Sequence, residues 1–285
     1  MASHRKLRAA SVVAVVAVVA GPAPVAAWAA PDLPAAAPSL SGPSLSAVSA
    51  LSVAPSPDPF ADLTAEEIAD RAVTATRSAT SLRMAGRIVT DGQPLDIDLA
   101  LDDREECTGV MKIKGGTAEL RKADRITYLK GDETFWRVSM ASQGMAEAQI
   151  AATIELVKGR WLKIAPGQPG SGDLGNVCDL KGLLSDLDKN KNDKEEDKGG
   201  ALTRGPDAEV DGTPVATLVK KKAGGETSTV SVSREGKPYI LKTVKTGGAE
   251  PGSITLSDYD KPVDVVVPPA DETVDLSKLV RTGPA

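Results

Sequence analysis

The chain has 285 residues, and its 34 basic and 39 acidic side chains give a net charge of −5. That balance speaks against a nucleic-acid partner, which a basic surface would favour. The one histidine, His4, lies in the basic start of the chain, so none remains downstream for Ser-His-Asp or Cys-His catalysis or for a histidine-ligated metal site. No glycine-rich phosphate loop precedes a predicted helix. We therefore predict a protein that is not an enzyme, with no catalytic residue, cofactor, metal ion or nucleic acid.

The first 58 residues predict export followed by a tether. A basic head, His4 to Arg8, precedes an apolar run over 9–20 and then Ala27-Trp28-Ala29, which is typical of a cleavage site. The apolar run is shorter than the ~20 residues that span a bilayer. Residues 1–30 are therefore predicted to be a secretory signal peptide, and the Pro-, Ala- and Ser-rich residues 31–58 a disordered tether. We expect the folded domain over 59–280, outside the cytoplasmic membrane, with peripheral or no attachment to it.

The first predicted helix begins after Thr64. Thr64-Ala65-Glu66-Glu67 has the form of a capping box, in which the threonine and glutamate side chains satisfy free backbone N–H groups of the first turn. Small residues follow at helical spacing, with Ala72, Ala75 and Ala79 on one stripe. We expect this stripe to face the rest of the domain.

Residues 82–130 predict a meander of antiparallel strands. Asp91-Gly92 is a strong two-residue hairpin signal, since both positions tolerate positive φ. Pairing outward from this turn places the charged Arg87 and Asp96 opposite each other on one face. A one-residue slip would move every apolar residue to the charged face, so the register is well specified. The expected apolar pairs are Ile88–Leu95, Gly86–Ile97, Met84–Leu99 and Leu82–Leu101.

A second hairpin is expected at Gly115-Gly116. With these two residues as the turn, Ile113 lies opposite Ala118 and Met111 opposite Leu120, again on the apolar face. The predicted sheet therefore has one apolar and one polar face, and its apolar face needs a cover.

Two further helices and a second set of strands complete the prediction. A helix over 145–158 carries Ile150 and Ile154 on one side, a short strand follows over 161–164, and a helix over 180–187 presents a leucine stripe that includes Leu184. This order predicts an α+β fold with an antiparallel sheet and its helices on one side. The later strands are expected over 215–219, 229–233, 239–244, 254–256 and 263–267.

The two cysteines predict a disulfide. In an exported chain an even number of cysteines favours a bond, here between Cys107 and Cys178, with two free thiols as the alternative.

A different signal lies over 186–197, where acidic and amide residues have calcium-loop spacing. Lys191 occupies the glycine position of that loop and Asp197 replaces its bidentate glutamate, so a solvated charged loop is the favoured interpretation.

Several short segments, in their order along the chain, resemble a known family. They are Phe135-Trp136, Lys158-Gly159-Arg160-Trp161, Cys178-Asp179-Leu180 and the run SDYDKPV from Ser257 to Val263. Over about residues 60–279 the chain resembles the LolA-like superfamily and, within it, the actinobacterial LppX/LprG-type (LppX_LprAFG) lipoproteins. One feature departs from that pattern, because residues 27–31 contain no lipobox cysteine.

The resemblance implies a strongly curved antiparallel half-barrel whose helices cover the concave face. It also implies a carrier that holds acyl chains of a lipid or lipoglycan in an apolar cavity. Two other classes stay open: a sensor of the RseB type that binds an envelope protein partner, and a structural surface protein with a packed core. The expected cavity-lining residues are Leu82, Met84, Ile88, Leu95, Ile97, Leu99, Met111, Ile113, Leu120, Ile150, Ile154 and Leu184.

The predicted lid is built from small residues. Besides the alanines of the first helix, the central helix carries Ala148, Ala151 and Ala152. Aromatic residues make up only 3% of the chain, so little else is available to fill the space between lid and sheet. We therefore expect an apolar pocket on the order of several hundred Å³, the size class that holds a ligand.

Overall fold

The computed structural model describes residues 58–90, 92–168, 177–185, 200–222 and 224–275, which belong to one compact unit, Pro55–Ala285. The predicted signal peptide, residues 31–57 and the loop with calcium-like spacing lie outside the described residues. No helix in the described part of the chain is long and apolar enough to cross a membrane.

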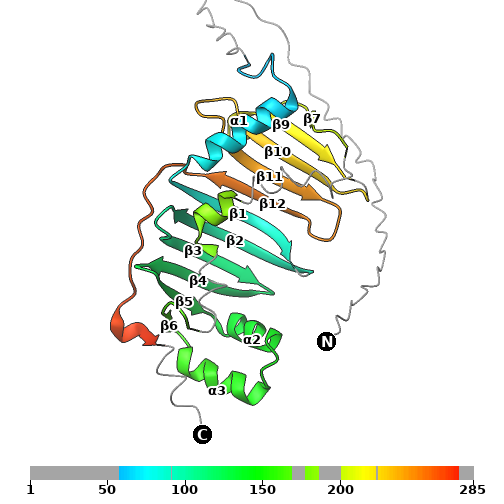
Figure 1. Cartoon of the computed structure of the whole chain (residues 1–285). Helices are drawn as coiled ribbons and strands as arrows, with labels where there is room; N and C mark the ends of the chain where they lie inside the picture. Colours follow the sequence, from blue (N-terminus) through cyan, green and yellow to red (C-terminus); the bar gives the residue numbers. More distant parts are fainter. Residues whose placement is uncertain (1–57, 91, 169–176, 186–199, 223, 276–285) are drawn as a thin grey trace, which may run out of the picture. The chain divides into compact units, whose positions relative to one another are not determined.

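The described residues form an α+β fold around one open, curved sheet (Figure 1). Its thirteen described strands follow the order β13-β6-β5-β4-β3-β2-β1-β12-β11-β10-β9-β7, and β8 also pairs with β9. Described neighbours are antiparallel except β13 and β6, which are parallel. The predicted fold class is confirmed. The strands are β1 (Ser81–Thr90), β2 (Gln93–Asp102), β3 (Cys107–Ile113), β4 (Gly116–Ala123), β5 (Ile126–Gly131), β6 (Trp161–Ile164), β7 (Thr203–Arg204), β8 (Ala208–Val210), β9 (Thr213–Lys221), β10 (Thr227–Ser233), β11 (Ile240–Thr246), β12 (Gly252–Ser257) and β13 (Thr273–Asp275).

The register predicted for the first hairpin is confirmed. β1 and β2 pair from Ile88–Leu95 next to the turn to Leu82–Leu101 at the far end, and the pairs between them are also as predicted. On the opposite face Arg87 donates through Nη2 to Asp96 at 2.8 Å. The alternation of apolar and charged residues therefore sufficed to place both faces of this hairpin.

The second hairpin turns one residue earlier than predicted. Lys114 and Gly115 are the two turn residues, with φ of 48° and 83°, and Ile113 pairs with Gly116 rather than with Ala118. Every later pair of β3 and β4 moves by the same two positions. Because side chains in a strand alternate with a period of two, this shift leaves the same residues on the apolar face.

Helix α2 (Glu133–Ser142), which was not predicted from the sequence, gives the reason for the shift. A Cβ atom at Gly116 would lie 2.3 Å from the backbone nitrogen of Phe135, so only glycine lets α2 pack onto the start of β4. Asp132 caps this helix, because its carboxylate accepts from the N–H of Phe135 at 2.7 Å and from the N–H of Thr117 at 2.8 Å. The packing of α2 therefore keeps Gly116 in strand β4, and the turn forms one residue earlier.

Helix α1 (Ala65–Arg77) begins with the predicted capping box. The N–H of Glu67 donates to Thr64 Oγ1 at 3.2 Å, and the N–H of Thr64 donates to the Glu67 carboxylate at 2.8 Å. Its buried residues Ile68 and Ala72 join a hydrophobic cluster with Leu218 of β9 and residues of β10 and β11. The helix therefore covers the end of the sheet formed by β9–β11 rather than the predicted meander.

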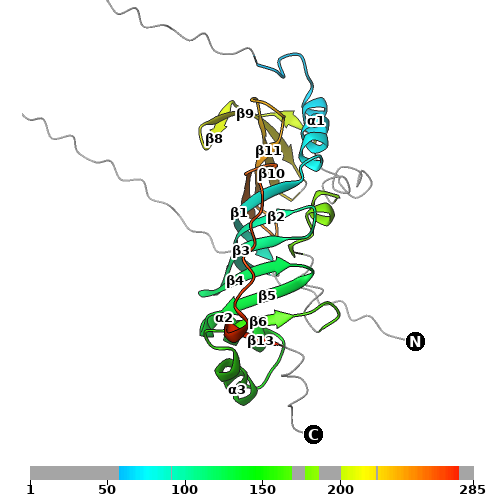
Figure 2. The same ribbon diagram turned by 90° about the vertical axis from the view of Figure 1, so that its left-hand side faces the viewer.

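The other helices lie toward the opposite end of the sheet or over its middle. α3 (Glu147–Val157) falls within its predicted range, packs on α2 and buries Ile150, Ile154 and Val157. Residues 180–185 are also helical and bury Leu180 and Leu184. Figure 2 shows this segment and α1 on the same side of the sheet.

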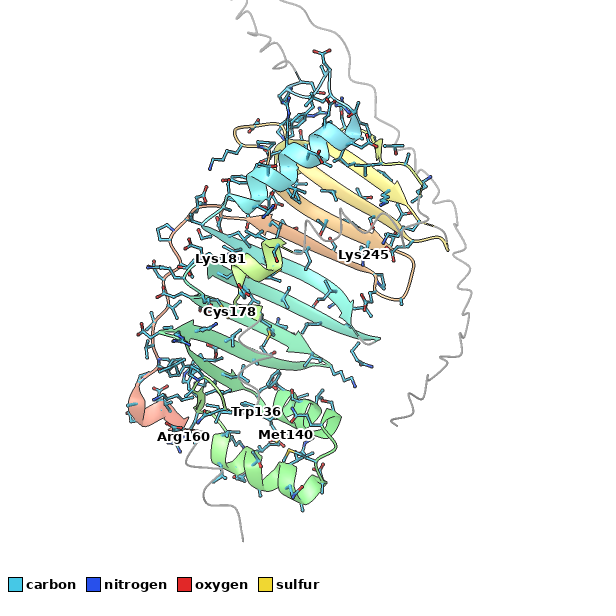
Figure 3. All side chains as sticks on the ribbon, viewed as in Figure 1. Trp136, Met140, Arg160, Cys178, Lys181 and Lys245 are labelled. Carbon is cyan, nitrogen blue, oxygen red and sulfur yellow. A yellow bond between two sulfur atoms is a disulfide. The ribbon has the colours of Figure 1, made fainter. Side chains whose placement is uncertain are left out.

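The predicted disulfide is confirmed. Cys107 and Cys178 are bonded, their Cα atoms lie 5.5 Å apart, and both residues are buried. Figure 3 shows Cys178 just before the helical segment 180–185. The bond therefore fastens that segment to β3.

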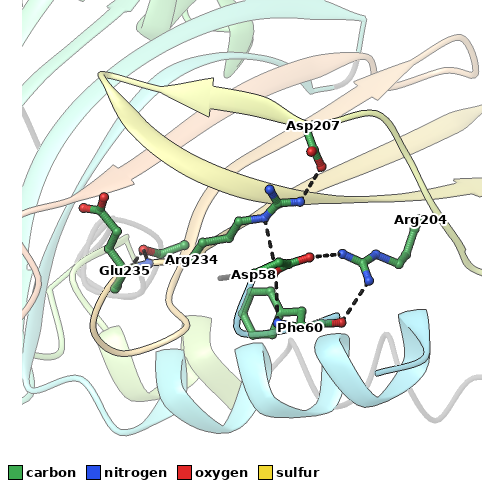
Figure 4. Close-up of polar contacts among 7 residues, drawn as sticks. Asp58, Phe60, Arg204, Asp207, Arg234 and Glu235 are labelled. Atoms are coloured by element: carbon green, nitrogen blue, oxygen red, sulfur yellow. Dashed lines mark hydrogen bonds and ion pairs between the residues drawn. The ribbon is translucent and has the colours of Figure 1, made fainter. Parts of the chain in front are cut away.

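The start of the domain is held by an ionic network (Figure 4). Arg204 donates to the Asp58 carboxylate at 2.8 Å and to the carbonyl oxygen of Phe60 at 2.9 Å, while Arg234 lies between Asp58 and Asp207. Burial alone would raise the pKa of Asp58, but its hydrogen bonds with Phe60 and Arg204 lower it. Asp58, predicted as the last tether residue, is thus fixed to the folded domain.

The chain after β12 differs from the prediction. Residues 263–267 do not form a strand, although Val263 is buried. A short 3-10 helix (Ala270–Glu272) leads instead into β13, which pairs in parallel with β6. Arg121 fixes the segment between β12 and β13, because its guanidinium donates to the carbonyl oxygen of Val266 at 2.8 Å. The Cζ atom of the same guanidinium lies 4.4 Å from the centroid of the Trp161 ring.

Candidate functional site

The candidate site is the inner face of the sheet, defined as the face that carries Leu82, Leu99 and Leu120 and on which α1 and the segment 180–185 lie (Figures 1 and 2). The register of the paired strands identifies the residues of β1–β6 and β9–β12 that lie on this same face. Leu256 of β12 packs against both hydrophobic clusters of the described residues, so the two halves of the face are continuous.

Eleven of the twelve predicted cavity residues belong to one hydrophobic cluster. Ile88 is half-buried and lies outside both described clusters. These eleven residues differ in solvent exposure. The difference matters for binding, because a ligand can contact only side chains that are not already buried by the protein. The buried members are Leu82, Leu99, Met111, Leu120, Ile150, Ile154 and Leu184, and the half-buried members are Met84, Leu95, Ile97 and Ile113.

Burial decreases along the strands of the inner face. At the end next to the disulfide, Leu82 is 4% exposed and Leu101 and Cys107 are fully buried. Toward the other end, Ile97 and Ile113 are only half-buried although they sit on the same strands. The segment fastened by the disulfide covers the first end, while the second end leaves apolar side chains partly open to solvent.

The prediction that the alanines of the central helix face the sheet and leave a cavity there is wrong. Ala148, Ala151 and Ala152 are exposed, because α3 turns its isoleucines inward to α2 and its alanines outward. Ala72 of α1 is buried as expected, but it faces the cluster over β9–β11. The alanines therefore do not form a lid over the meander.

A cavity of about 410 Å³ lies beside the helix pair, away from most of the predicted lining. Glu119 and Lys130 from the outer face of β4 and β5 form one wall, and Trp136 and Ile154 form another. Ile154 is the one predicted residue that lines it. The Trp136 indole Nε1 is buried and has no hydrogen-bond partner among the described residues. This cavity is a cleft next to α2 rather than the predicted space over the meander.

The inner face also carries charges that the sequence analysis did not single out. In β1–β6 and β9–β12 the charged residues on this face are Lys122, Lys220 and Lys245, with no aspartate or glutamate among them. Lys122 is buried and pairs with Glu105 at 2.8 Å, whereas Lys245 is exposed. The alternation Leu218, then Lys220, within an otherwise apolar stripe was the signal that could have identified them.

The SDYDKPV run forms a clamp at the start of β1. The rings of Tyr239 and Tyr259 stack with centroids 4.0 Å apart, and Tyr239 donates to the Asp260 carboxylate at 2.6 Å. The N–H of Thr80 donates to the same carboxylate at 2.9 Å. These hydrogen bonds lower the pKa of Asp260 to about 2, while burial raises the pKa of Tyr259. The run thus joins β1, β11 and β12, and its role here is structural.

The clamp predicts a pH-dependent effect of Asp260→Asn. Because the folded-state pKa is about 2 and the ordinary value is 3.8, the ionised carboxylate stabilises the fold fully above pH 3.8, and this contribution is lost as pH falls toward 2. Asp260 is partly exposed, so we expect the variant to lose up to about 1 kcal/mol of unfolding free energy at pH 6. Urea titrations between pH 2 and 6 measure the difference, and the exposed Asp264→Asn is the control. A difference that persists unchanged at pH 2 would contradict this assignment.

Comparisons with known proteins give structural similarities alone. No family model matches the chain, and no curated protein sequence matches it. The chain is similar to the crystal structure of LprF from Mycobacterium bovis, at 14% identity over 72% of this chain and 96% of that one, with a TM-score of 0.48. It is similar to the lipoprotein LppX of Mycobacterium tuberculosis at 14% identity, covering 71% and 98%, with a TM-score of 0.44. A third similarity is to the MucA/MucB complex structure of Pseudomonas aeruginosa, at 15% identity, covering 73% and 59%, with a TM-score of 0.30.

Proposed function

We propose that this chain is an extracytoplasmic carrier that binds acyl chains of a lipid or lipoglycan on the inner face of its sheet. The observation that supports the proposal is the set of half-buried apolar residues there, Met84, Leu95, Ile97 and Ile113, next to a fully buried core on the same strands. Burial of each acyl methylene contributes about 0.8 kcal/mol, so a surface of this kind binds without any reacting group.

The proposal places binding on one half of the inner face. Leu99 and Leu120 of the predicted set are fully buried and form the floor that holds the strands in place. Ile150 and Ile154 belong to the packing of α3 on α2 and are not proposed to contact the ligand. We also propose that residues 1–30 direct export, that residues 31–57 form a tether, and that binding rather than catalysis is the activity.

The test is lipid recovery from the purified protein. After expression of the full chain, we expect organic extraction and mass spectrometry to recover acyl lipids at a reproducible ratio. Ile97→Trp should reduce that ratio severalfold, because the indole would occupy the half-buried surface between Gly86 and Met111. Val110→Trp on the outer face of β3 is the matched control and should bind as wild type does.

Two results would contradict the carrier proposal. One is a preparation that yields no lipid from wild type, and the other is an equal lipid content in Ile97→Trp and Val110→Trp proteins that both retain wild-type circular dichroism. If Ile97→Trp does not fold, Ile97→Phe repeats the test with a smaller ring. A wild-type protein free of lipid would favour the sensor class, which binds a protein partner.

A further inference from the structure

We propose that the cleft beside α2 is a second binding site, which takes a small organic acid between Trp136 and two lysines, Lys130 and Lys158. The site lies apart from the half-buried residues of the inner face, so the inference goes beyond the proposed carrier function and does not rest on it. Its basis is a cavity of about 410 Å³, within the size range that holds small ligands. In its lining the tryptophan and lysine donors have no hydrogen-bond or ion-pair partner among the described residues, whereas each carboxylate has one.

Trp136 supplies both an apolar wall and a buried donor. With Ile154 it forms the apolar side of the cleft, against which the body of the ligand would lie. The residue is only 8% exposed, and its indole N–H has no hydrogen-bond partner among the described residues. A Cβ at Gly131, which also lines the cleft, would lie 3.0 Å from that nitrogen, so the nitrogen edge of the ring is turned toward Gly131. A buried donor without an acceptor is unfavourable, and a ligand oxygen that reaches this edge would satisfy it.

The carboxylates of the cleft are already engaged within the protein. Asp132 uses one oxygen to cap α2 and the other to accept from a backbone N–H of β4. Glu133 pairs with Arg137 at 3.0 Å, and Glu119 lies 3.8 Å from Arg121. A ligand that can only donate hydrogen bonds would therefore have to compete with existing contacts for each of these three carboxylates.

The two lysines of the cleft are not engaged in this way. Lys130 is half-buried with its Nζ atom 5.8 Å from the centroid of the Trp161 ring, and Lys158 is exposed at the end of α3. Neither forms an ion pair with a described residue, and their flexible stems can bring both ammonium groups to one carboxylate. The charged side chains that line the cleft and their ion-pair partners comprise as many cations as carboxylates, so the unpaired ammonium groups set the preference for an anion. They are Lys130, Lys158, Arg121 and Arg137 against Glu119, Asp132, Glu133 and Glu147.

The probes are naphthalene carboxylate and naphthylmethylamine, which share a ring system and carry opposite charges. Each is titrated into the isotope-labelled full chain, and NMR follows the indole N–H resonance of Trp136, which is assigned from its loss in Trp136→Phe. We expect the carboxylate to shift this resonance saturably and the amine to leave it in place. Lys158→Gln should weaken binding of the carboxylate roughly threefold, the range of an exposed ion pair. Trp136→Phe keeps a ring but removes the donor, and should weaken the same probe roughly tenfold.

Lys112→Gln is the matched control, because Lys112 is exposed on β3 and does not line the cleft, and it should bind the carboxylate as wild type does. If Trp136→Phe does not fold, Lys158→Gln still decides the test, since Lys158 is exposed. Three results would overturn the inference: no saturable shift of an indole resonance in wild type, equal binding of the two probes, or equal effects of Lys158→Gln and Lys112→Gln. The lipid content of the same preparations tests the carrier proposal separately, and Lys158→Gln should leave it unchanged.

Discussion

Replacement of both Cys107 and Cys178 by alanine is expected to lower the free energy of unfolding by about 4 kcal/mol. The bond joins residues 71 positions apart, and in the chain-entropy model opening a loop of that length restores this much freedom to the unfolded chain. The effect exceeds that of any single surface contact described above. In the folded state, loss of the bond should also release the segment 180–185, which it fastens to β3.

The measurement is urea unfolding of wild type and of the double variant, each with and without a reducing agent. Reduction should bring wild type to the stability of the variant and should leave the variant unchanged. Hydrogen exchange should show faster opening at Leu180 and Leu184 than in the capped helix α1. Equal stability of the two proteins without reductant would show that the bond adds nothing to the fold.

Gly116→Val is expected to destabilise the fold by about 3 kcal/mol, at the upper end of the range for overpacked sites. The added Cβ would lie 2.3 and 2.5 Å from the backbone N and Cα of Phe135, and a backbone cannot rotate aside as a side chain can. α2 must therefore move away from β4, and Phe135 and Trp136 lose part of their burial.

Gly200→Val provides the control, since among the described residues a Cβ at Gly200 would meet only the carbonyl oxygen of Lys221, at 3.3 Å. Urea unfolding gives the stability of each variant, and near-ultraviolet circular dichroism reports whether Trp136 keeps its fixed environment. A Gly116→Val protein as stable as the Gly200→Val protein would refute the close packing of α2 on β4.

The sequence predicted the elements that depend on local pattern. The Asp91-Gly92 turn and the alternation around it sufficed for the register of β1 and β2, and the capping box sufficed for the start of α1. These signals are contained within a few residues, so they do not depend on what packs against them.

The wrong predictions and the elements that were not predicted depend on contacts between distant parts of the chain. The turn at Lys114 could not be placed because α2, which was not predicted, fixes Gly116 from outside the hairpin. β13 was missed because its three residues pair with β6 from more than a hundred positions away. The exposed alanines of α3 were assigned to the wrong side because a helix with apolar residues around much of its circumference does not reveal which side its partner takes.

For the candidate site, the sequence identified the apolar set but not its division into buried and open residues. That division depends on which end of the strands the disulfide-fastened segment covers, and neither Cys107 nor Leu184 indicates this on its own. The lysines were missed for a related reason, because Lys220 and Lys245 become neighbours only through the pairing of β9, β10 and β11.

The border of the sheet at β9 has a consequence for association between molecules. A nine-residue strand with free N–H and C=O groups is a template for strand addition by another chain, which leads to aggregation. Here β8 and β7 occupy the two ends of β9, and the N–H groups of Gly205 and Gly200 donate to the carbonyl oxygens of Thr217 and Lys221, each at 2.7 Å. Short strands and irregular backbone thus shield this edge, and a large open sheet can be maintained without polymerising through it.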